Sequence, residues 1–188
     1  FPAMIAVTIV DGAVEPAEHP DPVAAAGELL VRVRAAGING ADILQRKGAY
    51  PPPPGYPEDI PGLEFAGEVI AIGAGVTRFC VGDRVMTITG GGGQAELAVV
   101  HEAVALSVPE SVDWAAAGGF AEAFLTAHDA IFGQATLRPG ARLLVNGAAG
   151  GILVHRVDRH AARTDGHAVQ IERDVRVRCD VVAGAGHG

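Results

Sequence analysis

Residues 62–75 have the sequence GLEFAGEVIAIGAG, and this stretch decides the fold class. Its residues 63–72 are apolar enough for a strand of buried-sheet character, and Gly73 and Gly75 supply the turn that ends the strand. Residues 81–86, with the sequence VGDRVM, then turn and restart a strand. Short strands separated by frequent turns are typical of a small β-barrel, so the pattern predicts a mainly β fold.

The strand-and-turn pattern continues on both sides of this stretch. Residues 4–10 are predicted as a strand, and residues 28–38 alternate apolar side chains with arginines as a half-buried strand does. A flexible glycine run at 90–93 precedes another predicted strand at 94–100. The pattern persists to about residue 108, which gives the predicted barrel its extent.

A predicted helix and a loop interrupt these strands. Asn39 suits a helix N-cap, with Asp42 three residues on and Gly48 as the stop signal. Residues 50–57, YPPPPGYP, can be neither helix nor central strand, because proline lacks the backbone N–H that both need. We therefore expect a surface loop there.

The rhythm of the sequence changes after residue 108. Asp113 can cap a helical stretch, and residues 121–132 are predicted as a second helix. Residues 142–146 are then predicted as a short apolar strand that leads directly into the glycine-rich stretch at 147–151. A strand followed by a glycine loop is how a dinucleotide-binding unit begins.

Composition narrows the class of protein. The chain has 188 residues, 49% of them hydrophobic, and a formal net charge of -8, which argues against a nucleic-acid partner. No apolar run approaches the ~20 residues of a membrane helix, and residues 1–4 do not resemble a signal peptide. Two distant cysteines do not make a disulfide framework, so a cytoplasmic protein is expected.

The end of the chain differs in composition from the rest. Residues 152–188 hold six arginines against five acids, about +1, although the whole chain carries -8. Only these 37 residues follow the glycine loop, whereas a Rossmann sheet needs on the order of 150. We expect domains at 4–120 and 121–151 and an atypical tail at 152–188. A shifted reading frame is one hypothesis for that tail, and a specialised segment is the other.

Seven motifs, in this order, resemble the medium-chain dehydrogenase/reductase superfamily, specifically its zinc-independent quinone oxidoreductase (zeta-crystallin-like) branch. They lie at residues 35–42, 45–50, 62–69, 81–85, 91–96, 122–127 and 146–151. The resemblance covers residues 4–151. It implies a mainly β fold with α: a GroES-like twisted β-barrel catalytic domain, followed by the first strand and glycine loop of an incomplete Rossmann α/β domain.

The resemblance also implies a cofactor and a set of site residues. Family members hold NADPH between the two domains, with NADH as the alternative, and pass hydride to a quinone or a similar activated carbonyl or enone. The matching residue for substrate orientation is Tyr50. The residues expected to bind the cofactor are Asn39, Tyr50, Thr126, Asn146, Gly147, Ala149, Gly150 and Gly151. Full-length family members also form homodimers.

The resemblance argues against a metal. Asn39 and Leu63 stand where zinc-dependent alcohol dehydrogenases of the superfamily have cysteine and histidine, although Glu64 is retained. Asparagine and leucine are not zinc ligands, so none is expected. Two alternatives remain open from the sequence: an enoyl reductase of the same superfamily, and a non-catalytic GroES-like fragment that binds no cofactor.

Overall fold

The computed structural model describes residues 3–138. The chain divides into two units, Phe1–Glu122 and Ala123–Gly188. The predicted strand at 142–146, the glycine loop at 147–151 and the tail at 152–188 lie outside the described residues.

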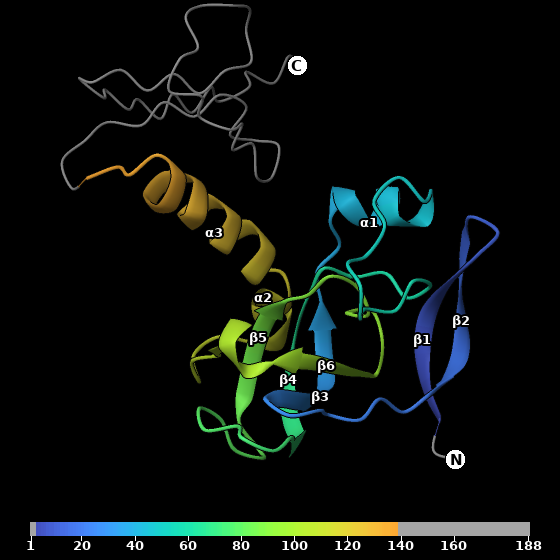
Figure 1. Cartoon of the computed structure of the whole chain (residues 1–188), viewed down its shortest axis with the longest axis horizontal. Coiled ribbons are helices and arrows are strands. Elements are labelled where there is room, and N and C mark those ends of the chain that lie inside the picture. The colour runs from blue at the N-terminus through green and yellow to red at the C-terminus, as the bar shows by residue number, and fades with distance from the viewer. Residues whose placement is uncertain (1–2, 139–188) are drawn as a thin grey trace, which may run out of the picture. The chain divides into compact units, whose positions relative to one another are not determined.

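The first unit is built on a five-stranded antiparallel sheet with the strand order β6-β3-β4-β5-β7 (Figure 1). Its strands are β3 (Glu28–Ala36), β4 (Glu64–Ile72), β5 (Arg84–Ile88), β6 (Leu97–His101) and β7 (Ala105–Ser107). A hairpin of β1 (Ala3–Val10) and β2 (Ala13–Pro20) forms a second sheet. This architecture confirms the mainly β prediction.

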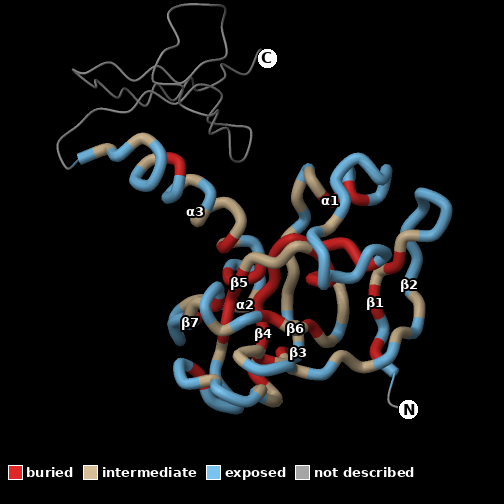
Figure 2. The backbone as a smooth tube through the Cα atoms, in the orientation of Figure 1, coloured by how far each residue is buried: buried red, intermediate tan, exposed pale blue. Residues whose placement is uncertain are grey.

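The central strand, β4, is the stretch from which the fold was predicted. Phe65 and Val69 belong to one core cluster, whereas Ala66 packs in a second cluster with Ala117. Because both faces of β4 are covered, its sequence is apolar without strict alternation. Residues 64–67 at the start of β4 are buried, and Figure 2 shows buried tube in this part of the sheet.

The hairpin is joined to the sheet through residues 94–96. The Val7 N–H donates to the Gln94 carbonyl at 2.9 Å, and the Glu96 N–H donates to the Ile5 carbonyl at 2.9 Å. The chain thus pairs first with β1 and then, from Leu97, with β3, which curls the β-structure toward a barrel. The predicted strand at 94–100 is therefore wrong at its start, since β6 begins at Leu97.

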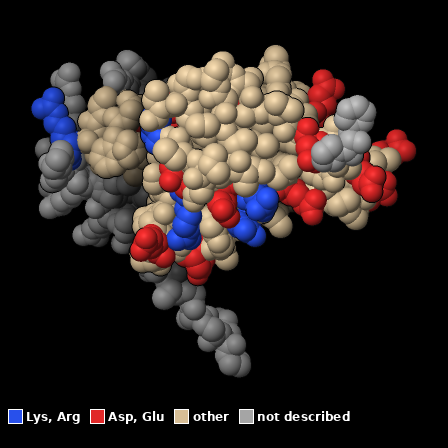
Figure 3. All heavy atoms as spheres, turned by 90° about the horizontal axis from the view of Figure 1, so that it is seen from below, with Lys and Arg blue, Asp and Glu red and all other residues tan. Residues whose placement is uncertain are grey.

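Strand β2 was missed because its sequence holds Pro16 and Pro20. Pro16 pairs with Val7, whose N–H already donates to Gln94, so the missing proline donor breaks no hairpin hydrogen bond. Proline on the outer side also prevents pairing with another chain. Residues 1–27 add four acids and no Lys or Arg, and the hairpin end of the surface in Figure 3 is accordingly acidic.

The helices follow the predicted caps. Asn39 has extended backbone angles, φ −116° and ψ 156°, before α1 (Gly40–Arg46), and Gly48 has a φ of +68° after it. The Asp113 carboxylate accepts from the Ala116 N–H at 2.7 Å and caps α2 (Trp114–Gly118). The predicted helix at 121–132 is α3 (Ala121–His128), which continues as the π-helix η2 (Asp129–Gln134). A 3-10 turn, η1 (Glu102–Val104), precedes β7.

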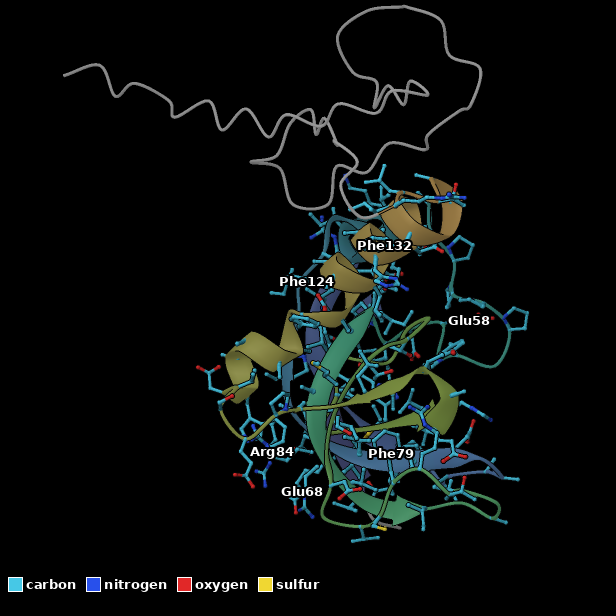
Figure 4. All side chains as sticks on the ribbon, turned by 90° about the vertical axis from the view of Figure 1, so that its left-hand side faces the viewer. Glu58, Glu68, Phe79, Arg84, Phe124 and Phe132 are labelled. Carbon is cyan, nitrogen blue, oxygen red and sulfur yellow. The ribbon has the colours of Figure 1, made fainter. Side chains whose placement is uncertain are left out.

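Arg84 on β5 holds the segment between β7 and α2. Its guanidinium donates to the carbonyls of Val112 at 2.7 Å, Pro109 at 3.3 Å and Glu110 at 3.4 Å. It also lies 4.3 Å from the centre of the Trp114 ring. The neighbouring Glu68 on β4 pairs with Arg84 in the strand register, and Figure 4 shows both at the same end of the sheet.

Candidate functional site

The site is built around a hydrogen bond between Asn39 and Glu64. The Asn39 Nδ2 donates to Glu64 Oε1 at 3.0 Å. The β3–β4 register pairs Ala36 with Phe65 and so brings the residues just beyond β3 against the start of β4. Gly37 is the contact point, since a β-carbon there would overlap the Glu64 carboxyl group. A glycine is therefore required at position 37 for this arrangement.

The second carboxylate oxygen of Glu64 also accepts a hydrogen bond. Glu64 Oε2 accepts the backbone N–H of Glu122 at 2.9 Å, in the first turn of α3. The Glu64 side chain is only 3% exposed. A buried carboxylate with a donor on each oxygen has a fixed orientation, and it links β4, the start of α1 and the start of α3.

Asp42 adds a second buried carboxylate. Its Oδ2 accepts from the Asn39 N–H at 2.7 Å and from Gln94 Nε2 at 3.3 Å. Its Oδ1 is buried and has no hydrogen-bond partner among residues 3–138. Burial, with a smaller contribution from the Glu64 charge, raises the pKa of Asp42 above its ordinary value.

Glu122 makes the cluster a group of three acids. Burial raises the pKa of Glu122, and the charges of Glu64 and Asp42 raise it further. For Asp42 and Glu122, burial and like charge both favour the protonated form. The sequence identified Asp42 only as a helix residue and did not single out Glu122, because nothing local in the sequence shows that both lie near Glu64.

Gln45, also missed from the sequence, connects α1 to two loops. Its Oε1 accepts from the Gly62 N–H at 3.3 Å, and its Nε2 donates to the Gly90 carbonyl at 3.0 Å. Gly90 in turn lies against the proline loop, where a β-carbon would come within 2.7 Å of Pro53. The glycine run predicted as flexible is thus a closely packed support for that loop.

The residues predicted to bind the cofactor differ in their burial and in the part of the chain where they lie. Asn39 is half-buried and contacts Glu64, as described above. Tyr50 begins the proline loop, is 46% exposed and makes no hydrogen bond within the described part of the chain. Thr126 is exposed on α3, in the second unit. Asn146, Gly147, Ala149, Gly150 and Gly151 lie outside the described residues.

The donors around Asn39 do not fit a zinc site of the alcohol dehydrogenase kind. The Asn39 amide is turned to donate to Glu64, and Leu63 is an apolar side chain that is 4% exposed. Between residues 3 and 138 no three or more His, Cys, Asp or Glu side chains are grouped so that they could hold a metal ion. Zinc sites in proteins use thiolate, imidazole or carboxylate ligands.

The described residues fit part of a nicotinamide nucleotide. Its hydroxyl and carboxamide groups need hydrogen-bonding partners, and the Asn39 amide and the exposed Tyr50 hydroxyl are such groups. The residues expected to hold its phosphates are those of the glycine loop.

Comparison with known proteins decides the family. The model of the alcohol dehydrogenase GroES-like domain matches residues 25–133, more than half of the chain. The chain belongs to this GroES-like family. Within the medium-chain dehydrogenase/reductase superfamily, its relatives place it in the quinone oxidoreductase-like branch, as the motifs predicted. The GroES-like fold prediction is thereby confirmed as well.

Three relatives of this GroES-like protein illustrate the similarity. The synaptic vesicle membrane protein VAT-1 homolog of Rattus norvegicus is 39% identical over 140 residues, which are 74% of this chain and 33% of that protein. The quinone oxidoreductase-like protein 2 homolog of Nematostella vectensis is 38% identical over 132 residues, 70% of this chain and 36% of that protein.

The third is a solved structure, that of the human synaptic vesicle membrane protein VAT-1 homolog-like protein. It has a TM-score of 0.72 and 32% identity, covering 80% of this chain and 50% of that one. The chain thus spans about a third of the length of the curated relatives it matches. In the described part of the chain, no helix is long and apolar enough to cross a membrane.

Proposed function

We propose that this GroES-like chain belongs to a cytoplasmic oxidoreductase that transfers hydride from NADPH to a quinone or a similar activated carbonyl or enone, without zinc. The observation that carries the proposal is the Asn39–Glu64 hydrogen bond. By the motif resemblance, Asn39 corresponds to a zinc-binding cysteine of the zinc-dependent members, and an amide held by Glu64 supports a role for Asn39 other than binding a metal. The similarity to the quinone oxidoreductase-like protein 2 homolog of Nematostella vectensis supports the quinone class.

The absence of metal ligands bears on the substrate. A simple ketone needs strong polarisation of its carbonyl, which a metal ion supplies in many enzymes. A quinone or an enone accepts hydride more readily, because the charge that develops is delocalised. A site built from an amide and a tyrosine hydroxyl therefore suits an activated acceptor.

The chain's own residues would bind and orient the reactants. NADPH, when bound, supplies the hydride. Asn39 provides a hydrogen-bonding amide whose position Glu64 fixes. Tyr50 has an exposed hydroxyl that can donate a hydrogen bond to a substrate oxygen as negative charge develops there. Thr126 and the glycine loop at 146–151 are proposed to complete the cofactor site.

The direct test is a calorimetric titration of NADPH into the purified 188-residue chain, followed by assay of quinone reduction. We expect saturable binding with a micromolar dissociation constant, and NADPH oxidation that depends on the quinone. Tyr50→Phe should slow quinone turnover, whereas Tyr56→Phe, in the same loop, is the matched control and should leave turnover unchanged.

Other results of these assays would support an enoyl reductase, a non-catalytic domain or a zinc-dependent enzyme instead. Preferential reduction of an enoyl thioester in competition with the quinone would identify an enoyl reductase. No binding at millimolar NADPH would mean that this chain, by itself, is a non-catalytic GroES-like domain. Activity that is lost on treatment with a zinc chelator and restored by zinc would contradict the zinc-independent mechanism.

A further inference from the structure

Resting on the proposed function, we infer that Glu64 is a positioning residue that determines which atom of Asn39 meets the cofactor. An ionised carboxylate can only accept hydrogen bonds. The atom of Asn39 that faces Glu64 Oε1 at 3.0 Å must therefore be the amide nitrogen. The ligand then meets Asn39 Oδ1, an acceptor, and the ligand group bound there is a donor: a ribose hydroxyl or a carboxamide NH₂.

Glu64 can impose this orientation because it cannot move. Its second oxygen accepts the Glu122 N–H at 2.9 Å, and Gly37 packs against its carboxyl group. The side chain is 3% exposed, so water does not compete for either oxygen. Glu64 has no donor to offer, and an Asn39 amide turned the other way would place its oxygen against a carboxylate oxygen.

Asn39 Oδ1 keeps capacity for a ligand although Asn39 is the N-cap of α1. An amide oxygen has two lone pairs, so it can face the helix N-terminus with one and accept from a ligand with the other. Asn39 is half-buried, which leaves part of the side chain accessible.

The first variant is Glu64→Gln, which turns over the Asn39 amide while keeping a hydrogen bond between positions 39 and 64. Its amide oxygen can take the Glu122 N–H and its NH₂ can donate to Asn39, whose own amide must then turn over. The Asn39 NH₂ then faces the N-terminus of α1 in place of Oδ1, so we expect the N-cap to weaken and the melting temperature to fall by about 2–4 °C. The ligand now meets an NH₂ group, and the NADPH dissociation constant should rise on the order of tenfold.

The second variant is the exchange Asn39→Asp with Glu64→Gln. The amide at position 64 then donates to the carboxylate at position 39, and the ligand again meets an acceptor. We expect NADPH affinity within about threefold of wild type. Glu68→Gln, on the same strand, is the control and should leave affinity unchanged. In the exchange, a carboxylate oxygen at position 39 again faces the N-terminus of α1, so the melting temperature should recover together with the affinity. If Glu64 were merely structural, the exchange would restore the melting temperature but not the affinity.

Equal NADPH affinity in wild type and Glu64→Gln, or no recovery in the exchange, overturns the inference. If no variant and no wild-type chain binds NADPH, the proposed function fails for this chain, and a second measurement decides the inference by itself. In the ¹⁵N-labelled, cofactor-free chain, the Asn39 side-chain NH₂ signals should show slow hydrogen exchange that is lost in Glu64→Gln. Signals that are the same in both proteins would overturn it.

Discussion

Gly37 lies so close to Glu64 that a single methyl group on its α-carbon would overlap the Glu64 side chain. Gly37→Ala must therefore displace Glu64 and break its hydrogen bonds to Asn39 and Glu122. We expect a loss of about 1–3 kcal/mol in the free energy of unfolding, measured by urea denaturation. Gly40→Ala is the matched control, since a β-carbon there meets nothing within 4 Å. Equal stability of the two variants would contradict this packing.

The raised pKa of Asp42 predicts a pH dependence of stability. The folded state binds this proton more tightly than the unfolded state. The stabilisation that protonated Asp42 gives the folded state is therefore complete below 3.8, the pKa of Asp42 in the unfolded chain. It is lost as the pH rises through the higher pKa of the folded state. Asp42→Asn keeps an acceptor for the Asn39 N–H but carries no charge.

We accordingly expect Asp42→Asn to be more stable than wild type at pH 7 and to lose that advantage as the pH falls toward 3.8. Thermal melts of both proteins across this range measure the difference. An advantage that does not change with pH would show that folding does not raise the pKa of Asp42.

The stability that Glu102 contributes should depend on pH in the opposite direction to that of Asp42. Backbone N–H groups of Arg78 at 2.8 Å and Thr77 at 2.9 Å donate to its carboxylate and lower its pKa. Its stabilising contribution is present above the unfolded value of 4.5 and is lost as the pH falls through the folded pKa. Glu102→Gln is therefore expected to be less stable than wild type at pH 7, with the difference shrinking in acid. The same thermal melts would contradict this if the difference grew.

Arg84 should matter more than a typical surface arginine, because it holds three carbonyl groups and the Trp114 ring. Arg84→Ala is expected to lower the free energy of unfolding by about 2 kcal/mol. Arg84→Lys should recover little, because an ammonium group lacks the planar fork of donors.

The control for Arg84 is Arg34→Ala. Arg34 pairs with Glu68 at 3.2 Å, but the two side chains are 43% and 36% exposed. Such a pair contributes about 0–1 kcal/mol. Urea denaturation that ranked Arg34→Ala as the more damaging change would contradict the assignment of Arg84.

Sequence patterns located most of the helices and strands, but they did not show which residues bind the Glu64 carboxylate. The strands around Val31 and Val69 and the caps Asn39 and Asp113 were predicted correctly, since alternation and capping depend on neighbours in the chain. Strand β2 was missed because proline argues against a strand unless the pairing partner is known.

The sequence by itself determined the family, the mainly β fold and the replacement of expected zinc ligands by Asn39 and Leu63. Only the tertiary structure decided that the Asn39 side chain donates to Glu64, 25 positions away. It also decided that the Glu122 N–H, 58 positions from Glu64, donates to the other oxygen of the same carboxylate. The reason is physical: local propensities act over a few residues, whereas the orientation of a buried polar group depends on partners that only the folded chain brings together.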